Sequence, residues 1–340
     1  MRVGVIGAGA WGTALGLTSH RAGNKTTLWH RDGTTLQTIR THRSHPQLPG
    51  VLLPPDLHFT NQPQDLTHAD VIILAVPVQA MGDIIQLFKP FIAPASLCLI
   101  AAKGIQKGTG SLMSPLIHSE IPSLPLGVIS GPNFATEIAK NLPAASTLAC
   151  APDIWPQFQE ALSHPKFRLY HTPDLVGVQL GGALKNVVAI ACGIIKSKGL
   201  GENARASLVT RALQEMIRLG QAMGANPETF VGLSGIGDLM LTCMGTQSRN
   251  LKLGEGLGQH ATPWENLERS LKTVEGVHTA QSIHLLSQKH HVEMPICNAV
   301  YQIIQGTQTP EEAIQGLLAR PPAGKESVTF QRRSDAPITK

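Results

Sequence analysis

A strand–turn–helix unit at the amino terminus constrains the fold of this chain more than any other feature. Val3 to Ile6 is an apolar run typical of a buried strand, and a helix is predicted to continue to about Arg21. The turn between them reads Gly7-Ala8-Gly9-Ala10-Trp11-Gly12. In such a turn the first glycine permits a sharp bend, the second lets a pyrophosphate approach the backbone, and the third lets helix and strand pack closely. The spacing predicts a dinucleotide-binding unit, with a purely structural glycine turn as the alternative.

The end of the second predicted strand, Thr26 to Trp29, carries the residues that usually choose between NAD and NADP. It continues as His30-Arg31-Asp32. An acidic residue at this place takes the ribose hydroxyls of NAD, whereas an arginine accommodates the 2′-phosphate of NADP. Because both residue types are present and adjacent, the sequence leaves the cofactor preference open.

Further apolar runs predict a parallel sheet covered by helices on both faces. These runs lie at residues 71–76, 97–102, 126–129, 145–150 and 167–170. Continuous apolar strands separated by helical stretches are typical of such a sheet, which binds its ligands at the carboxyl ends of the strands.

After about Asp174 the pattern becomes helical. Helices are predicted within 176–223 and near 264–272, 278–290, 295–305 and 310–319. We therefore predict an α/β dinucleotide-binding domain at 1–175, a helical substrate domain at 176–320 and a loosely ordered tail at 321–340.

Composition excludes several classes of function. The net charge of +5 comes from scattered Lys and Arg, and aromatic residues make up only 4%, which argues against nucleic-acid binding but allows steering of small anions. Five widely spaced cysteines in apolar surroundings predict buried reduced thiols and a cytoplasmic protein. No metal site is predicted, because no His or Cys cluster has ligand spacing. Glycines within residues 3–20 argue against a signal peptide, and no transmembrane helix is predicted.

Several polar residues lie within apolar stretches of the sequence. Burying a polar side chain costs folding free energy unless it is paired, so such residues are expected to have a partner or a function. Lys103 follows a predicted strand, Lys185 is expected to start a largely apolar helix, and Asp238 follows a Gly-Ile-Gly turn. Reduction of a carbonyl by hydride needs a proton donor, and a lysine with a lowered pKa can serve. Ser248-Arg249-Asn250 could supply the cation and fixed donors that a phosphate needs.

Each of these residues also has a structural interpretation. Lys103 could extend its ammonium to solvent at a domain edge, and Lys185 could be a structural cation at a buried helix start. Asp238 could be a helix N-cap, and Arg249 a solvated or ion-paired surface residue. Their occurrence together favours the functional interpretation.

At these residues the chain resembles the bacterial-type glycerol-3-phosphate dehydrogenases, from residue 3 to about 318. The motifs in the first half are the glycine turn continued by Thr13-Ala14-Leu15, Ala102-Lys103-Gly104-Ile105 and Ile129-Ser130-Gly131-Pro132-Asn133-Phe134-Ala135. Those in the second half are residues 177–187, Asn203-Ala204-Arg205-Ala206, Gly235-Ile236-Gly237-Asp238-Leu239, Gln247-Ser248-Arg249-Asn250, Val274-Glu275-Gly276 and Glu293-Met294-Pro295-Ile296. So many ordered motifs are far more specific than the glycine turn alone.

The resemblance implies a Rossmann-type domain followed by an all-helical domain similar to that of 6-phosphogluconate dehydrogenase. It implies that Lys185 is the catalytic proton donor or acceptor. The implied substrate contacts are Lys103, Gly131, Asn133, Lys185, Asp238, Ser248, Arg249 and Asn250. The implied cofactor contacts are Gly7, Gly9, Ala10, Trp11, Gly12, His30, Arg31, Lys103, Ala135, Arg249, Thr273 and Glu275. The bacterial enzymes often carry Thr or Ser at position 133 and Ser at position 10, so the detailed contacts of Asn133 and Ala10 are open.

The implied activity is reversible hydride transfer between NAD or NADP and dihydroxyacetone phosphate, giving sn-glycerol 3-phosphate for glycerophospholipid synthesis. A related 3-hydroxy acid or ketopantoate-type dehydrogenase is the alternative substrate class. A dinucleotide-binding regulatory or structural module without catalysis is the alternative from a different class. A homodimer is expected from the family.

Overall fold

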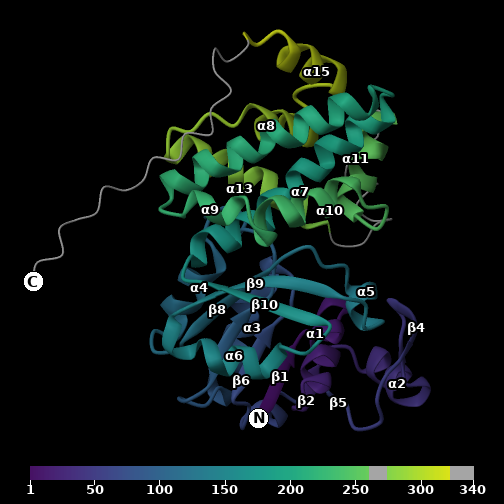
Figure 1. The fold of residues 1–340 in the computed structure, drawn as a ribbon, viewed down its shortest axis with the longest axis vertical. Helices are drawn as coiled ribbons and strands as arrows, with labels where there is room; N and C mark the ends of the chain where they lie inside the picture. Colours follow the sequence, from purple (N-terminus) through teal and green to yellow (C-terminus); the bar gives the residue numbers. More distant parts are fainter. Residues whose placement is uncertain (260–273, 322–340) are drawn as a thin grey trace, which may run out of the picture.

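The computed structural model describes residues 1–259 and 274–321. The first half of the chain forms a sheet with its covering helices, and the second half forms a helical layer that lies above them in Figure 1. The last strand ends at Thr172 and a long helix begins at Leu175, which supports the proposed division near residue 175. The predicted helix at 264–272, and the predicted tail apart from Pro321, lie outside the described residues.

The sheet contains eight strands in the order β10-β9-β8-β7-β6-β1-β2-β5. Their bounds are β1 Arg2–Ile6, β2 Lys25–Trp29, β5 His58–Thr60, β6 Val71–Leu74, β7 Leu97–Ile100, β8 Leu126–Ser130, β9 Ala144–Cys150 and β10 Phe167–Thr172. A separate antiparallel hairpin consists of β3 Ser44–His45 and β4 Leu48–Leu52. Sequence patterns missed β5 and this hairpin. β5 has only three residues, and the hairpin contains Pro46 and Pro49, which interrupt any strand pattern.

Helices cover both faces of the sheet, as predicted. They are α1 Ala10–Arg21, α2 Gly33–His42, α3 Met81–Phe88, α4 Met113–Glu120, α5 Ala135–Ala139 and α6 Trp155–Leu162. Val71 and Ile73 of β6 belong to the core beneath α1 and α6, whereas Ile72 and Leu74 belong to the core beneath α3 and α4. Because successive strand residues point to opposite faces, an uninterrupted apolar run fills both cores.

The predicted parallel sheet contains one antiparallel pairing, which the sequence did not indicate. β9 runs antiparallel to β8, with Gly127 opposite Cys150, and β10 then pairs parallel to β9. The connection from β8 to β9 contains only the five-residue helix α5, about 7.5 Å long at 1.5 Å per residue. Strand β8 spans roughly twice that length, so this helix cannot return the chain to its start, as a parallel crossover requires.

The helical layer is built around α7. Its helices are α7 Leu175–Ser197, α8 Gly201–Ala222, α9 Pro227–Phe230, α10 Asp238–Met244, α11 Arg249–Gln259, α13 Glu275–Lys289, α14 Pro295–Ile304 and α15 Pro310–Leu318, with a π-helical turn at Leu233–Gly237. By length and hydropathy α7 could cross a membrane, but its most apolar 18-residue window is wholly buried in the protein. It is the core helix of this layer. The five cysteines are free and buried, as predicted.

Lys185 lies in the middle of α7, so the prediction that it starts a helix was wrong. The helix begins ten residues earlier, where the Asp174 carboxylate accepts a hydrogen bond of 2.8 Å from the Gly177 N–H. Gly181 and Gly182 both lie inside α7 and make close contacts with neighbouring elements. A Cβ at Gly181 would stand 2.3 Å from the Ser234 carbonyl oxygen. These glycines therefore bring α7 close to its neighbours rather than ending it.

Candidate active site

The glycine turn has the geometry that its spacing predicts. Gly7 has φ +106°, and a Cβ there would lie 2.8 Å from the Ala75 carbonyl oxygen. A Cβ at Gly12 would lie 1.9 Å from the Gly7 carbonyl oxygen, so this glycine permits the contact between helix and strand. A Cβ at Gly9 would meet only the tip of Gln47, at 3.9 Å. The first and third glycines are thus required by packing, whereas Gly9 leaves open space where a pyrophosphate can approach.

The first turn of α1 presents Ala10 and Trp11. The Ala10 N–H donates to Oε1 of Gln47 at 3.1 Å, a contact that the sequence did not suggest. The Trp11 indole N–H donates to the Ala101 carbonyl at 3.0 Å, and its ring centroid lies 5.6 Å from Nζ of Lys103. Trp11 therefore connects the glycine turn to the lysine that follows β7.

Arg31 and Asp32 differ sharply in their partners. The Asp32 carboxylate caps α2 by accepting hydrogen bonds of 3.1 Å from the Thr34 and Thr35 N–H groups. These bonds, with one from the Thr35 hydroxyl as the largest cause, lower the pKa of Asp32. Arg31 is exposed and has no hydrogen bond or ion pair among residues 1–259 and 274–321. The His30 ring accepts from the Asp32 N–H at 3.0 Å. Of the two charged side chains, the guanidinium is the one left for a ligand.

Lys103, Lys185 and Asp238 form one buried cluster, which we call the Lys–Asp–Lys cluster. Asp238 Oδ2 lies 2.7 Å from Nζ of Lys103, and Asp238 Oδ1 lies 2.5 Å from Nζ of Lys185. The Asp238 side chain is fully buried, and the two lysine side chains are 15% and 9% exposed. Lys103 comes from the carboxyl end of β7, Lys185 from α7 and Asp238 from the start of α10. The cluster therefore lies where the strand ends meet the helical layer.

The Lys–Asp–Lys cluster carries one more positive than negative charge. Burial lowers the pKa of Lys103 to about 8, opposed by the Asp238 carboxylate and reinforced by the Lys185 ammonium. Burial by itself would raise the pKa of Asp238, but the two ammonium groups outweigh it and the pKa is lowered. The pKa of Lys103 is therefore lowered in the sense that a proton donor needs. The excess positive charge suits the cluster to an anionic ligand.

Each lysine retains one N–H for a ligand. Lys103 also donates to the Gly131 carbonyl at 3.0 Å, and Lys185 also donates to the Thr242 hydroxyl at 3.0 Å. An ammonium has three N–H donors, and within the described ranges each lysine uses two of them. Asp238 is the first residue of α10, after the N-cap Gly237, so the N-cap interpretation of this aspartate was wrong.

Sequence reasoning missed three polar residues beside the cluster. Thr242 donates to the Asp238 carbonyl at 2.6 Å while accepting from Lys185. The Ser130 hydroxyl donates to Asp238 Oδ2 at 3.3 Å. Asn186 donates to the Lys103 carbonyl at 3.3 Å. Thr242 follows Asp238 by one helical turn and Asn186 follows Lys185 directly, so helical spacing could have suggested the first and adjacency the second.

Asn250 is joined to the same network. Its Nδ2 donates to Oδ1 of Asn186 at 2.9 Å, and its Oδ1 accepts from the Gly276 N–H at 3.0 Å. Ser248 is buried, and its hydroxyl accepts from the Leu251 N–H at 3.2 Å as a cap of α11. Arg249 is the exposed first residue of α11. It is linked to Lys185 indirectly, because the residue after each of them, Asn250 and Asn186, takes part in the same hydrogen bond. The two cations that we expected at one site lie on contacting elements.

Two further predicted residues present buried oxygens with no hydrogen-bond partner among the described residues: Oδ1 of Asn133 and Oε2 of Glu275. Asn133 Nδ2 donates to the Ser146 hydroxyl at 2.6 Å. Glu275 Oε1 accepts from the Val78 N–H at 3.3 Å. Burial raises the pKa of Glu275, opposed by the Val78 hydrogen bond and the Arg249 charge. Unpaired buried acceptors of this kind are ready to receive a ligand's N–H or O–H.

Gly131 and Ala135 lie at the same edge of the sheet. A Cβ at Gly131 would stand 2.9 Å from Cα of Ser146. Ala135 begins α5 and, like Ala10 and Trp11, packs against the core beneath α1. Thr273 lies outside the described residues. Within the described ranges no group of three His, Cys, Asp or Glu residues could hold a metal ion.

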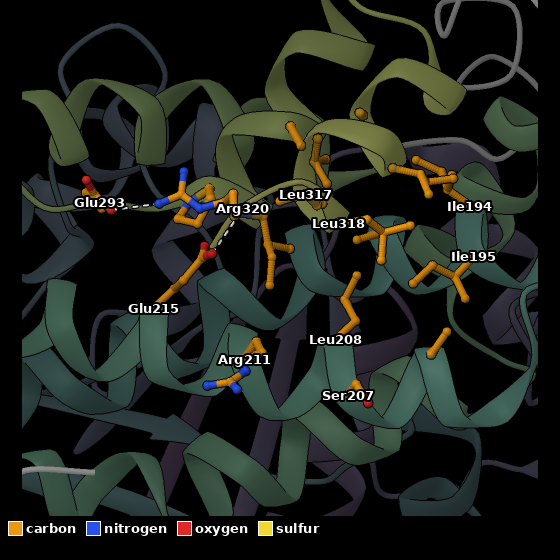
Figure 2. A pocket seen from close by; sticks show the side chains of 18 of the residues that line it. Ile194, Ile195, Ser207, Leu208, Arg211, Glu215, Glu293, Leu317, Leu318 and Arg320 are labelled. Carbon is orange, nitrogen blue, oxygen red and sulfur yellow. Dashed lines mark hydrogen bonds and ion pairs between the residues drawn. The ribbon is translucent and has the colours of Figure 1, made fainter. Parts of the chain in front are cut away.

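The cavity in Figure 2 is separate from this site. It has a volume of about 1000 Å³ and is lined by apolar side chains of α7, α8, α14 and α15, including Ile194, Leu208 and Leu317. Glu215 lies at its wall and accepts from the Ile296 N–H at 2.7 Å, and so caps α14. None of the predicted catalytic or binding residues lines this cavity. We therefore take the Lys–Asp–Lys cluster, rather than this cavity, as the candidate active site.

Comparison with known proteins agrees with this geometry. Residues 2–155 match the amino-terminal family of NAD-dependent glycerol-3-phosphate dehydrogenases, and residues 174–315 match the carboxyl-terminal family. A glycerol-3-phosphate dehydrogenase [NAD(P)+] from Rhodospirillum rubrum is 44% identical over 322 residues, covering 94% of this chain and 92% of the relative. One from Caulobacter vibrioides is 43% identical, covering 94% and 97%.

A solved structure agrees as well. The crystal structure of glycerol-3-phosphate dehydrogenase from Coxiella burnetii superposes with a TM-score of 0.89 at 36% identity, covering 94% of this chain and 99% of that one. Both halves of the chain are matched by family and by structure. The chain therefore belongs to the NAD-dependent glycerol-3-phosphate dehydrogenase family.

Proposed function

We propose that this chain interconverts dihydroxyacetone phosphate and sn-glycerol 3-phosphate by hydride transfer with NAD(P)H. The observation that carries the proposal is the buried Lys–Asp–Lys cluster, joined to Arg249 through the hydrogen bond between Asn186 and Asn250. A proton donor and a phosphate-binding cation are thereby held on neighbouring elements. The names of the relatives described above support the same reaction.

The glycine turn fits a dinucleotide, because Gly9 leaves open space and a buried oxygen of Glu275 has no hydrogen-bond partner within the described ranges. The proposed cofactor contacts are those implied by the resemblance: Gly7, Gly9, Ala10, Trp11, Gly12, His30, Arg31, Lys103, Ala135, Arg249, Thr273 and Glu275. NAD(P)H, when bound, supplies the hydride that the C2 carbonyl of the substrate accepts. Since Asp32 caps α2 while Arg31 has no partner within the described ranges, we expect NADPH to be preferred.

In the proposed reaction Lys185 transfers the proton. Its ammonium is held by Asp238 and Thr242, and its remaining N–H faces no acceptor among the described residues. During reduction Lys185 releases this proton to the ketone oxygen, and during oxidation the neutral amine takes it back. Asp238 keeps the ammonium in place and compensates its charge. Lys103, Gly131 and Asn133 contact the substrate hydroxyl and carbonyl groups in this proposal.

The substrate phosphate is bound by Ser248, Arg249 and Asn250 in the proposed complex. The Arg249 guanidinium is exposed and free to form paired hydrogen bonds with two phosphate oxygens. Asn250 retains one amide hydrogen after donating to Asn186. The Ser248 hydroxyl accepts from the backbone of its helix and can still donate its own hydrogen.

A spectrophotometric assay tests the proposal. Oxidation of NADPH and NADH is followed with dihydroxyacetone phosphate, with ketopantoate and with a short 3-oxo acid. We expect turnover with the ketone phosphate, and a lower KM for NADPH than for NADH. Turnover only with a non-phosphorylated keto acid would assign the chain to the related dehydrogenases. No turnover with any of these ketones would favour a binding module.

Arg249→Ala is expected to weaken substrate capture. Loss of a charged hydrogen-bonding partner should raise the KM for dihydroxyacetone phosphate about tenfold to a hundredfold, with a smaller effect on kcat. Steady-state kinetics measure both constants. Arg211→Ala is the matched control, because Arg211 is an exposed arginine that lines the separate cavity and should leave KM unchanged. An unchanged KM and kcat in Arg249→Ala would contradict the phosphate assignment.

The activity should fall as the pH rises through about 8, where Lys103 loses its proton. The pKa of Lys103 is lowered, so its charge disappears at a lower pH than that of an ordinary lysine. We expect kcat/KM for dihydroxyacetone phosphate to decline on the alkaline side, because the neutral amine no longer attracts an anion. Lys103→Arg should move this decline to higher pH, since a guanidinium stays protonated. The same alkaline decline in that variant would exclude Lys103 as its cause.

We further propose a cytoplasmic homodimer, without membrane insertion, that supplies sn-glycerol 3-phosphate for glycerophospholipid synthesis. Leu200 and Leu318 are exposed beside the cavity of Figure 2 and make this face an apolar surface that a second copy could cover. Buried free cysteines fit a reducing compartment. Light scattering should give twice the chain mass of 36.3 kDa.

A further inference from the structure

We propose that Gln47, which lies outside the glycine motif, is a cofactor-positioning residue. Its amide oxygen accepts from the Ala10 N–H when no anion is present, and its amide nitrogen donates to the cofactor's pyrophosphate when one is bound. The inference rests on the proposed dinucleotide site and adds a residue from the hairpin formed by β3 and β4.

The first observation is that α1 lacks a cap of its own. Its N-cap residue is Gly9, which has no side chain, and its first turn contains no acidic residue. The Trp11 indole N–H is already bonded to the Ala101 carbonyl. Ala10 and Gly12 carry no polar side-chain atoms, so the first turn offers an anion backbone N–H groups alone. Of these, the Ala10 N–H is bonded to Oε1 of Gln47 at 3.1 Å.

The second observation is that the hairpin holds the backbone of Gln47 firmly at this place. His45 is buried, and its Nε2 donates to the Ala8 carbonyl at 2.9 Å. Its Nδ1 accepts from the Gln47 N–H at 3.1 Å, so one neutral imidazole connects the glycine turn to Gln47. Leu48, on the other side, is fully buried in the core beneath α1. The backbone is therefore fixed while the Gln47 side chain is exposed.

The third observation is the chemistry of the carboxamide. A glutamine amide carries an acceptor oxygen and a donor NH2 at nearly the same place, and rotation about its last bond exchanges them. With the helix N-terminus empty, the oxygen satisfies the Ala10 N–H. With a phosphate oxygen beside that N–H, the oxygen of Gln47 would face another acceptor, so the rotated amide with its NH2 toward the anion is favoured. A glutamate at this position could accept but never donate, and it would repel the pyrophosphate.

Direct binding of NADPH and NADH, measured by cofactor fluorescence without substrate, tests the inference. We expect Gln47→Ala to raise the Kd about threefold to tenfold, the loss of one donated hydrogen bond. Gln47→Glu should raise it further, because charge repulsion is added. Both losses should be equal for the two cofactors, because the pyrophosphate is common to them. The KM for dihydroxyacetone phosphate should not change.

Thermal unfolding separates this role from a structural one. Gln47→Glu preserves the acceptor for Ala10, so without cofactor its Tm should equal or exceed that of the unmodified protein, while its stabilisation by NADPH should be reduced. Gln159→Glu is the matched control for added charge. Gln159 is exposed on α6, at the end of α1 opposite to the glycine turn. The carbonyl of its neighbour Glu160 accepts a hydrogen bond from Asn24, which follows the carboxyl end of α1. This control should bind both cofactors normally.

The following results would overturn the inference. Unchanged or tighter binding by Gln47→Ala would mean that the amide only competes with the cofactor. A loss confined to NADPH would place Gln47 at the 2′-phosphate instead. Failure of the unmodified protein to bind either cofactor would refute both this inference and the proposed function, whereas normal binding by all Gln47 variants would refute the inference alone.

Discussion

Replacing Lys185 by alanine is expected to reduce kcat by a factor of ~10² or more while leaving cofactor binding nearly intact. The reason is that Lys185 supplies the proton in the proposed reaction but lies in α7, whereas the glycine turn proposed to bind the dinucleotide lies at the start of α1. Without its proton donor the ketone oxygen would have to receive a proton from water in a site that packing largely closes. Steady-state kinetics and fluorescence titration of NADPH measure the two quantities separately.

Two control variants make this result specific. Lys185→Arg keeps a cation beside Asp238 but cannot release its proton at neutral pH, so the fold should be retained and turnover should stay low. Lys196→Ala removes a lysine of the same helix that pairs with Glu255 on the protein surface. This variant should have nearly unchanged kcat and cofactor binding. Near-normal turnover in Lys185→Ala, or recovery of turnover in Lys185→Arg, would remove Lys185 from the role of proton donor.

Replacing Asp238 by asparagine should have an effect of comparable size for a different reason. Asp238 is fully buried and is the shared counter-charge of Lys103 and Lys185. Leaving buried charge without its partner costs about 3–5 kcal/mol of folding free energy, unless the lysines lose their protons. The pKa of Lys103, already lowered to about 8, should then fall further. At neutral pH we expect a loss of about 10² or more in kcat/KM, with the remaining activity shifted to lower pH.

Stability and pH profile must be measured together for this variant. Asp174→Asn is the matched control, because the Asp174 carboxylate caps α7 and accepts from Asn226 N–H and the Thr229 hydroxyl. Its loss should lower Tm without changing the pH profile of the remaining activity. If Asp238→Asn lowered only Tm, and kept an unchanged pH profile and kcat, Asp238 would be structural and the proposed charge coupling would be wrong.

Local patterns were sufficient for most of the fold. Apolar runs such as Val71 to Leu74 predicted buried strands, because a strand in a covered parallel sheet meets apolar cores on both faces. The same patterns failed for β9, whose direction depends on the length of the connection before it rather than on its own residues. They also failed at Lys185, which lies in the middle of α7 because the helix continues through Gly181 and Gly182 despite the low helix propensity of glycine.

The candidate site was predicted in part. Lys103, Lys185, Asp238 and Arg249 were selected because polar side chains within apolar stretches of sequence need partners. The resemblance then implied their roles. Neither argument showed that one aspartate serves two lysines, 135 and 53 positions away in sequence. Thr242, Asn186 and Gln47 were missed. Spacing from Asp238 could have suggested Thr242, and adjacency to Lys185 could have suggested Asn186. Gln47 lies in a hairpin that sequence patterns did not predict.

The sequence by itself determined the glycine turn and the dinucleotide-binding unit around it, because the requirements are largely local: Gly7 has φ +106°, and Gly12 contacts the Gly7 carbonyl five residues before it. Only the tertiary structure decided that the pKa of Lys103 is lowered and that Lys103 and Lys185 share Asp238. The physical reason is that a pKa depends on burial and on charges from every element packed around the group. Those elements come together only when the sheet and the helical layer meet.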